Sequence, residues 1–306
     1  MQIKKPLTKY LASLLMFGMN GIVASTIALG SLDIVLARTF IGSLFLIVLL
    51  VAARKKTNLF GNLKHTLYLA ISGLALGISW IFLYEAYRQV GVGTASLLYY
   101  CGPVIVMMLA PLIFHEKITV IKVAGLATVV AGMLFINGQA LQQGKSAWGL
   151  ICGLMSAVLY AAMVIFSKKA ESITGIGNAL GQLTAAFLSV AVFALTRKGF
   201  SFQIQIADLL PMLILGIVNT GIGCYFYFSS INNLPVQTVA ICGYLEPLSA
   251  VLFSMLFLHE RMSGYQLLGA ALILGGAAFG ELFPMQIKGA AIHAASSNSQ
   301  SMGNVK

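Results

Sequence analysis

Residues 244–261 read YLEPLSAVLFSMLFLHER, and residues 100–117 read YCGPVIVMMLAPLIFHEK. In both stretches a proline lies twelve residues before a His-Glu pair, inside an apolar segment. Aligning residues 94–132 with residues 238–276 without a gap gives nine identities in 39 positions. Chance would give about three in so apolar a sequence, so the constant offset of 144 residues marks an internal repeat. The chain therefore contains two copies of one unit.

The composition excludes a soluble globular domain. Of the 306 residues, 59% are hydrophobic and only 9% are charged. So few polar groups cannot cover a water-exposed surface, so lipid is expected to solvate the apolar exterior. The net charge of +11 sits in short Lys and Arg clusters at segment ends, a pattern typical of cytoplasmic loops and not of a nucleic-acid interface. The sequence predicts a polytopic membrane protein that is embedded in the lipid bilayer and binds no nucleic acid.

No cofactor or metal site is expected. The four cysteines fall in apolar segments without CxxC spacing, so they indicate neither a disulfide framework nor a metal centre. No GxxxxGK[ST] motif occurs, which argues against direct ATP hydrolysis. Lys4 and Lys5 before an apolar run resemble a signal peptide, but the length of that run and the many that follow favour an uncleaved first span.

Ten apolar segments approach the ~20 residues that a helix needs to cross the hydrocarbon core. Their connections are short, so adjacent spans are expected to be antiparallel neighbours. The seventh is the weakest, because Gln182 and Thr184 interrupt it. The expected spans cover residues 7–29, 33–53, 66–87, 94–114 and 119–137 in the first copy, and 147–167, 178–195, 209–230, 238–258 and 263–281 in the second.

The two copies occupy residues 1–142 and 143–283, and a Ser-, Asn- and Gly-rich tail at 284–306 is expected to be disordered. Because five spans is an odd number, the second copy is expected to be inserted upside down. Such inverted repeats are typical of transporters and place a substrate site near the membrane midplane. Most Lys and Arg lie on one side if the N-terminus is inside, so both termini are predicted to be cytoplasmic.

On these features the sequence resembles the EamA-type transporters of the drug/metabolite transporter superfamily. The paired proline-containing spans, the His-Glu loops and the glycines after each loop carry the likeness. The resemblance implies an all-α membrane protein of the bacterial inner membrane, with ten helices in two EamA repeats around a central cavity lined by spans 1, 3, 4, 6, 8 and 9. It also implies transport, commonly the efflux of amino acids, related metabolites or toxic compounds. The glycines are Gly125, Gly132, Gly269 and Gly276.

Glu246 is the strongest functional candidate. It lies about 12 Å from the inner end of its span at helical rise. A carboxylate at this depth is costly and points to a site or a charge pair, so Glu246 is expected to carry a proton or to meet a cationic substrate group. The alternative is that it pairs with an arginine or satisfies backbone groups freed by Pro247. The first copy has Gly102 at this position. Pro103 and Pro247 are expected to act as hinges when the halves rock.

Mid-depth aromatic and amide side chains on the cavity-lining spans complete the predicted site. Aromatics in membrane helices mostly pack or form interfacial belts, and amides often bridge helices. Mid-depth tyrosines on spans expected to line the cavity are less easily dismissed. Tyr100 and Tyr244 are equivalent in the repeat, so they are expected to face the axis from opposite halves. The predicted substrate-binding residues are Asn20, Trp80, Tyr84, Tyr100, Tyr160, Asn219, Tyr244 and Glu246.

Arg38 and Glu85 are the other intramembrane charges considered. Both are expected in the outer third of their spans, where they could form one buried pair. Alternatively, Arg38 pairs with Asp33 and Glu85 with Arg88 at i+3 on the same helix. A third possibility is that they take part in coupling or bind an anionic group of the substrate.

The His-Glu loops are interpreted as structural. Each precedes a Thr or Ser that could cap the next helix, and a carboxylate near a helix N-terminus is favoured by the helix dipole. We therefore expect these loops to connect helices and not to contact substrate. They contain His115 and Glu116 in the first copy, and His259 and Glu260 in the second.

The combined prediction is a secondary transporter that works by alternating access on a small-molecule substrate, with protons as a candidate coupling ion. It is not expected to be an enzyme, since the eight acidic residues are scattered singly. The alternatives are a passive channel or facilitator and, less favoured, an intramembrane enzyme acting on a lipid-linked substrate. Small-xxx-small glycine pairs indicate close helix packing and are compatible with a monomer or a homodimer.

Overall fold

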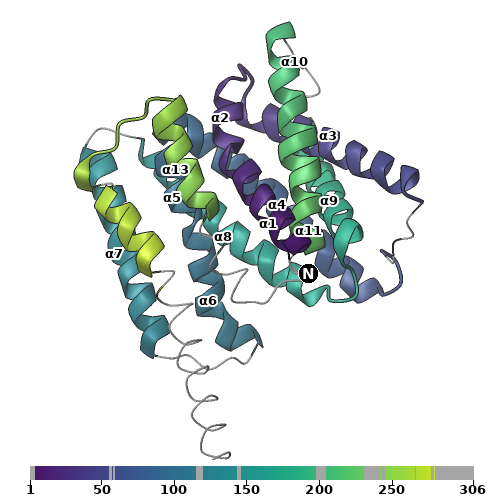
Figure 1. The fold of residues 1–306 in the computed structure, drawn as a ribbon, viewed down its shortest axis with the longest axis horizontal. Helices are drawn as coiled ribbons and strands as arrows, with labels where there is room; N and C mark the ends of the chain where they lie inside the picture. The colour runs from purple at the N-terminus through teal and green to yellow at the C-terminus, as the bar shows by residue number, and fades with distance from the viewer. Residues whose placement is uncertain are drawn as a thin grey trace, which may run out of the picture.

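The computed structural model is helical, with no strand among the residues that it describes. These are residues 4–54, 57, 59–114, 120–142, 146–197, 205–230, 242, 245–265, 267–276 and 279. Figure 1 shows the helices as a bundle with α4 and α8 in its interior. The predicted His115–Glu116 loop, Tyr244 and the tail at 284–306 lie outside the described residues.

Six helical segments of the described residues are long and apolar enough to cross a membrane, which agrees with the predicted spans 1, 2, 3, 6, 7 and 8. The seventh span, interrupted by polar residues in the sequence, forms a continuous helix. The six are α1 (Lys4–Gly18) with α2 (Asn20–Ser25); α3 (Ser31–Ala52); α4 (Leu63–Val90); α8 (Ala147–Lys169); α9 (Gly175–Arg197); and the run of α10 (Ile206–Leu213), the π-helix η1 (Ile214–Ile222) and α11 (Gly223–Ser230).

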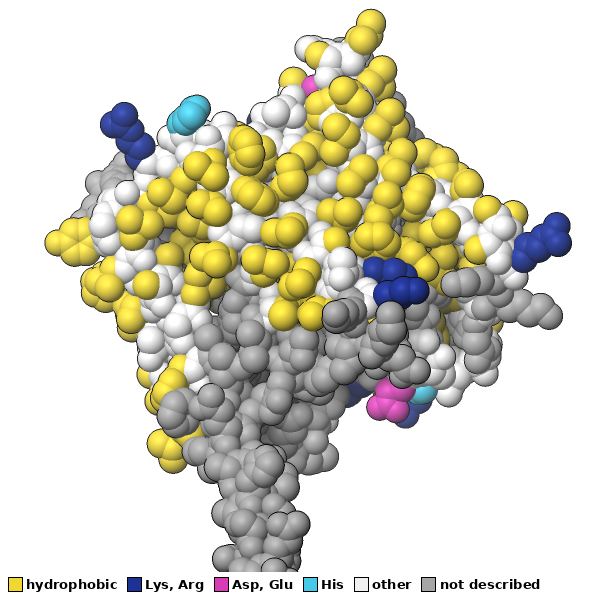
Figure 2. Space-filling view, in the orientation of Figure 1, with side chains coloured by type: hydrophobic (Ala, Val, Ile, Leu, Met, Phe, Trp, Pro, Cys, Tyr) yellow, Lys and Arg dark blue, Asp and Glu magenta, His cyan; other side chains and the backbone are white. Residues whose placement is uncertain are grey.

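The outside of this bundle is apolar. Figure 2 shows one broad face covered by hydrophobic side chains, with the charged side chains near its margins. Large apolar residues such as Val51 and Leu210 are 70% and 68% exposed. A contiguous exposed apolar surface of this kind suits a lipid environment and not water. The prediction of a multi-span membrane protein is confirmed at this level.

The remaining four predicted spans are not among these six segments, so the count of ten stays a prediction. The fourth consists of two helices separated at Tyr100, and the fifth, ninth and tenth correspond to one helix each. These helices are α5 (Val92–Tyr99) and α6 (Cys101–Phe114); α7 (Val120–Gln142); α13 (Leu245–Phe257); and the helix at Leu267–Gly276.

Both predicted hinge prolines lie in the first turn of a helix. Pro103 is the third residue of α6 and Pro247 is the third residue of α13, at equivalent positions of the repeat. A proline costs little there, because the first backbone N–H groups of a helix have no intrahelical acceptor. The interruption of the fourth span falls at Tyr100, three residues before the proline.

Glycines at equivalent positions pack α7 against the helix at Leu267–Gly276. A Cβ added at Gly132 would lie 2.7 Å from the carbonyl oxygen of Gly269, and one added at Gly276 would lie 2.8 Å from that of Gly125. The offset of 144 residues turns Gly132 into Gly276 and Gly125 into Gly269. The two contacts therefore exchange with each other when the two copies of the sequence are exchanged.

Candidate functional site

A cavity of about 670 Å³ lies inside the bundle. This volume is within the range of pockets that hold small molecules. The helices that line it are α1, α2, α3, α4, α5, α8, α9, α11 and α13. They include parts of spans 1, 3, 4, 6, 8 and 9, which the resemblance implied, and add Arg38 from the second span and Asn178 from the seventh.

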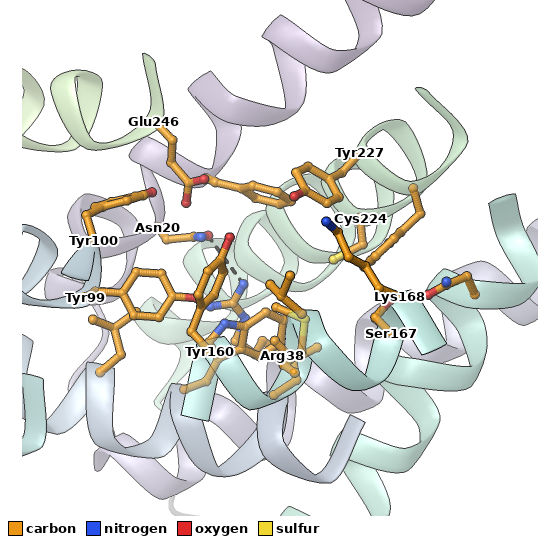
Figure 3. A pocket seen from close by; sticks show the side chains of 18 of the residues that line it. Asn20, Arg38, Tyr99, Tyr100, Tyr160, Ser167, Lys168, Cys224, Tyr227 and Glu246 are labelled. Atoms are coloured by element: carbon orange, nitrogen blue, oxygen red, sulfur yellow. Dashed lines mark hydrogen bonds between the residues drawn. The ribbon is translucent and has the colours of Figure 1, made fainter. Parts of the chain in front are cut away.

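The cavity collects most of the predicted substrate site. Figure 3 shows Glu246, Tyr100, Asn20 and Tyr160 around one space, with Arg38 beside Asn20. Tyr84 and Asn219 do not line the cavity; they lie behind its wall and hold residues that do. The predicted residues that line it are Asn20, Arg38, Trp80, Tyr100, Tyr160 and Glu246.

Arg38 is buried, with only 1% of its surface exposed, and is held by three other helices. Its guanidinium lies over the Trp80 ring, 4.1 Å from the ring centre. Its Nε donates to Thr220 Oγ1 at 2.9 Å, and its Nη1 donates to the Tyr84 hydroxyl. Its Nη2 donates to Asn20 Oδ1 at 3.4 Å, the weakest of these contacts. The guanidinium is therefore fixed in place by neutral groups.

The π-helix η1 supplies one of these acceptors. Thr220 Oγ1 donates to the carbonyl of Leu215 at 2.7 Å, a bond five residues back that fits the wider turn of a π-helix. The same hydroxyl oxygen accepts from Arg38. Gly42 of α3 lets this turn approach, since a Cβ there would lie 2.8 Å from Thr220 Cγ2. The irregular helix thus orients the arginine.

Asn219 is a positioning residue for Asn20. Its amide nitrogen donates to the Met16 carbonyl at 2.9 Å and to Asn20 Oδ1 at 3.2 Å. Asn20 Oδ1 therefore receives hydrogen bonds from both Asn219 and Arg38. The prediction placed both asparagines in the site, but only Asn20 lines the cavity.

Among the described residues, the predicted pairings of Arg38 with Glu85 or Asp33 are not formed. Arg38 donates instead to Thr220, Tyr84 and Asn20. Glu85 accepts from Ser31 Oγ at 2.7 Å and from Gln89 Nε2 at 2.8 Å. The sequence placed both charges at a similar depth, but Glu85 bonds Ser31 at the start of α3, whereas Arg38 lies seven residues farther along that helix. Glu85 therefore links α4 to α3. Of these two charged residues, only Arg38 lines the cavity.

Glu246 reaches the cavity from the first turn of α13. Figure 3 shows the Tyr100 hydroxyl pointing towards the Glu246 carboxylate. Tyr100 is at the interruption between α5 and α6, and its ring lies edge-on to Tyr99, with the ring centres 5.5 Å apart. Tyr99 in turn packs on Tyr160 at 5.1 Å. The carboxylate and the guanidinium thus share one cavity with these aromatic rings.

The cavity opens beside the connection between α8 and α9, which we name the Lys168 end. The exposed residues Lys168, Glu171 and Thr174 line it there. Sequence reasoning did not select these residues, because they resemble an ordinary polar loop. Tyr99 and Tyr227 were not predicted as site residues either, although both line the cavity. The adjacency of Tyr99 to Tyr100 was the one available signal.

Glu260 lies at the opposite end of the bundle and is not among the cavity-lining residues. Its carboxylate accepts from the backbone N–H groups of Val92 at 2.7 Å and Gly93 at 2.8 Å. The structural interpretation of this loop predicted capping of the following helix, whereas the carboxylate caps α5. The neighbouring His259 is exposed and has a φ of 52°.

Two ranges of the sequence, residues 7–138 and 147–280, each match the EamA-like transporter family. The chain belongs to the EamA-like transporter family. Members and relatives are named as transporters, so this EamA-like protein is a transporter and not an enzyme.

Several known proteins are similar to this EamA-like transporter. It is 27% identical to the uncharacterized transporter YxxF of Bacillus subtilis (strain 168), over 88% of this chain and 87% of that protein. It is 26% identical to a probable amino-acid metabolite efflux pump of Escherichia coli (strain K12), over 60% of this chain and 65% of that protein. A solved crystal structure shares the fold with a TM-score of 0.66 and 18% identity, covering 91% of this chain and 98% of the other.

Proposed function

We propose that this EamA-like transporter is a secondary-active carrier that exports amino acids or related small zwitterionic metabolites by alternating access. The observation that carries the proposal is that Arg38 and Glu246 line one cavity from opposite walls. Intramembrane charges are rare and generally mark a substrate or ion pathway. A cation and an anion in the same cavity match the two charges of an amino acid.

Arg38 is proposed to bind the substrate carboxylate. Guanidinium groups bind carboxylates through paired N–H donors in one plane. The Nη2 bond to Asn20 is long at 3.4 Å, so a substrate oxygen can take its place with small loss. Stacking on Trp80 leaves the donors in the guanidinium plane available for this contact.

Glu246 is proposed to meet the substrate amine or to carry the coupling proton. The Tyr100 hydroxyl points towards its carboxyl group, and both residues line the cavity. A carboxylate enclosed in a membrane protein gains from pairing with a cation or a proton. Competition between the two for one carboxylate would couple substrate release to protonation. The aromatic rings that line the same cavity would contact the substrate side chain.

Alternating access is supported by the two copies. Both match the family, and the Gly132–Gly269 and Gly276–Gly125 contacts exchange when the copies are exchanged. This is the pattern expected of an inverted repeat. A bacterial inner-membrane location with both termini in the cytoplasm follows from the charge distribution and is part of the proposal. The Lys168 end would then face the cytoplasm, from which an exporter loads its substrate.

Export of amino acids draws on one relative, which is named a probable amino-acid metabolite efflux pump. The test is counterflow with the purified protein in liposomes loaded with unlabelled amino acid. Uptake of external labelled amino acid that overshoots and saturates supports a carrier. Flux that neither saturates nor shows counterflow would indicate a passive channel, and conversion of a labelled lipid-linked compound would indicate an enzyme.

A further inference from the structure

Glu260 makes a contact that neither substrate binding nor the repeat alone explains. Its two carboxylate oxygens accept separately, Oε1 from Val92 N at 2.7 Å and Oε2 from Gly93 N at 2.8 Å. Val92 and Gly93 are the first two residues of α5, directly after Gly91 with its φ of 87°. The carboxylate therefore sits on the N-terminus of the helix that leads to the cavity.

The two N–H groups need a partner. The first backbone N–H groups of a helix have no intrahelical acceptor, and unsatisfied N–H groups are costly where water is scarce. A negative charge at this end also interacts favourably with the helix dipole. Glu260 satisfies both N–H groups at once. Both hydrogen bonds are therefore lost together if α5 and the Glu260 loop separate.

The contact joins the two halves of the molecule. Val92 and Gly93 belong to the first copy, and Glu260 belongs to the second. Close packing surrounds it. A Cβ added at Gly93 would lie 2.9 Å from both Ser254 Oγ and Met262 Cε, which are also in the second copy. The halves are therefore held together at this end, which we name the Glu260 end.

α5 separates this contact from the cavity. All eight of its residues are buried. Ser96 and Tyr99, farther along the helix, line the cavity, whereas Val92 and Gly93 meet Glu260. The described conformation is thus closed at the Glu260 end by α5 and open at the Lys168 end.

We propose that Glu260 is a gating residue: its carboxylate holds α5 in the position that closes the Glu260 end of the cavity. This inference rests on the proposed alternating access, in which the halves separate at one end as they close at the other. Opening the Glu260 end moves α5 away from α13 and breaks both hydrogen bonds. Weakening them shifts the population towards the conformation that is open at the Glu260 end.

The test uses a native thiol as reporter. Cys224 lines the cavity, and replacing Cys101, Cys152 and Cys242 by alanine leaves it as the only cysteine. A membrane-impermeant methanethiosulfonate is added to one side at a time of oriented proteoliposomes. The expected result in Glu260→Gln is a rise of about tenfold in the ratio of labelling from the Glu260 end to labelling from the Lys168 end. The amide keeps one acceptor but opposes the second N–H with a donor.

Arg261→Gln is the matched control, because Arg261 is exposed on the same connection and should leave the ratio unchanged. Glu260→Asp should give an intermediate ratio. An unchanged ratio in Glu260→Gln would overturn the proposal, and so would a lower melting temperature with an unchanged ratio, which would show a structural brace only. The labelling needs no substrate, so it stands even if the counterflow assay fails to identify amino acids.

Discussion

The guanidinium of Arg38 stacks on Trp80 at 4.1 Å, and both side chains line the central cavity. Stacking engages the face of the guanidinium and leaves its N–H donors to point outward in the plane. Three of those donors reach Thr220, Tyr84 and Asn20 on three different elements. The positive charge is thereby fixed before substrate arrives, which reduces the entropy lost on binding.

Arg38→Lys is expected to weaken binding of carboxylate-bearing substrates by about 10- to 100-fold, since a hydrogen bond to a charged group contributes about 1.5–3 kcal/mol. Lysine keeps the charge but loses the planar, paired donors and the stacking geometry. The measurement is amino-acid affinity by ligand-induced thermal stabilisation. Arg88→Lys, at an exposed position on α4, is the control and should bind as the native protein does. Equal affinities for both variants would rule out Arg38 as the carboxylate ligand.

Glu246→Gln is expected to abolish proton-driven accumulation while leaving the protein folded. Glutamine preserves the shape of the side chain, but it cannot exchange a proton. Uptake driven by a pH gradient is compared with amino-acid counterflow in the same liposomes. Loss of proton-driven uptake with counterflow retained assigns proton coupling to Glu246. Loss of both activities, only for substrates that carry an amine, assigns amine binding. Glu171→Gln at the Lys168 end serves as the control. Unchanged proton dependence would remove Glu246 from the coupling step.

The repeat and the apolar segments could be predicted because they depend on composition and spacing. The cavity-lining positions of Tyr100, Tyr160 and Glu246 also followed, since depth along a span can be counted. The side-chain partners could not. Whether Arg38 meets Glu85 or Thr220 depends on the rotation of each helix about its axis, and the spans lack a strong polar face. The π-helix that places Thr220 has no sequence signal of its own.

The His-Glu motif shows a different limit. Spacing placed Glu260 in a short connection before a Ser, which favoured capping of the following helix. The structure brings the start of α5, almost 170 residues earlier in the chain, to the same carboxylate. Contacts between distant segments depend on how the two halves assemble. The sequence therefore predicted the kind of interaction, a carboxylate at a helix N-terminus, but not which helix.

Gly276→Ala is expected to destabilise the protein by about 1–3 kcal/mol, because the added methyl group would lie 2.8 Å from the carbonyl oxygen of Gly125 and from Thr128. Gly275→Ala is the matched control on the adjacent residue, since a Cβ there meets nothing within 4 Å. Alanine should be neutral there or stabilise the helix by about 0.5–1 kcal/mol. Thermal unfolding in detergent measures both. Equal melting temperatures for the two variants would contradict the close packing of α7 against this helix.

A disulfide between Gly93→Cys and Ser254→Cys is expected to arrest transport. The Cβ position of Gly93 lies 2.9 Å from Ser254 Oγ, and a disulfide joins Cβ atoms about 3.5–4.5 Å apart, so the bond should form in the described conformation. The two residues lie in different copies and flank the Glu260 contact. Cross-linking therefore fixes the Glu260 end shut.

Counterflow should fall to background on oxidation and recover on reduction, while substrate binding from the Lys168 end persists. The single variants, oxidised in the same way, control for the loss of the glycine and the serine. Full transport by the cross-linked protein would show that α5 and α13 need not separate during the cycle.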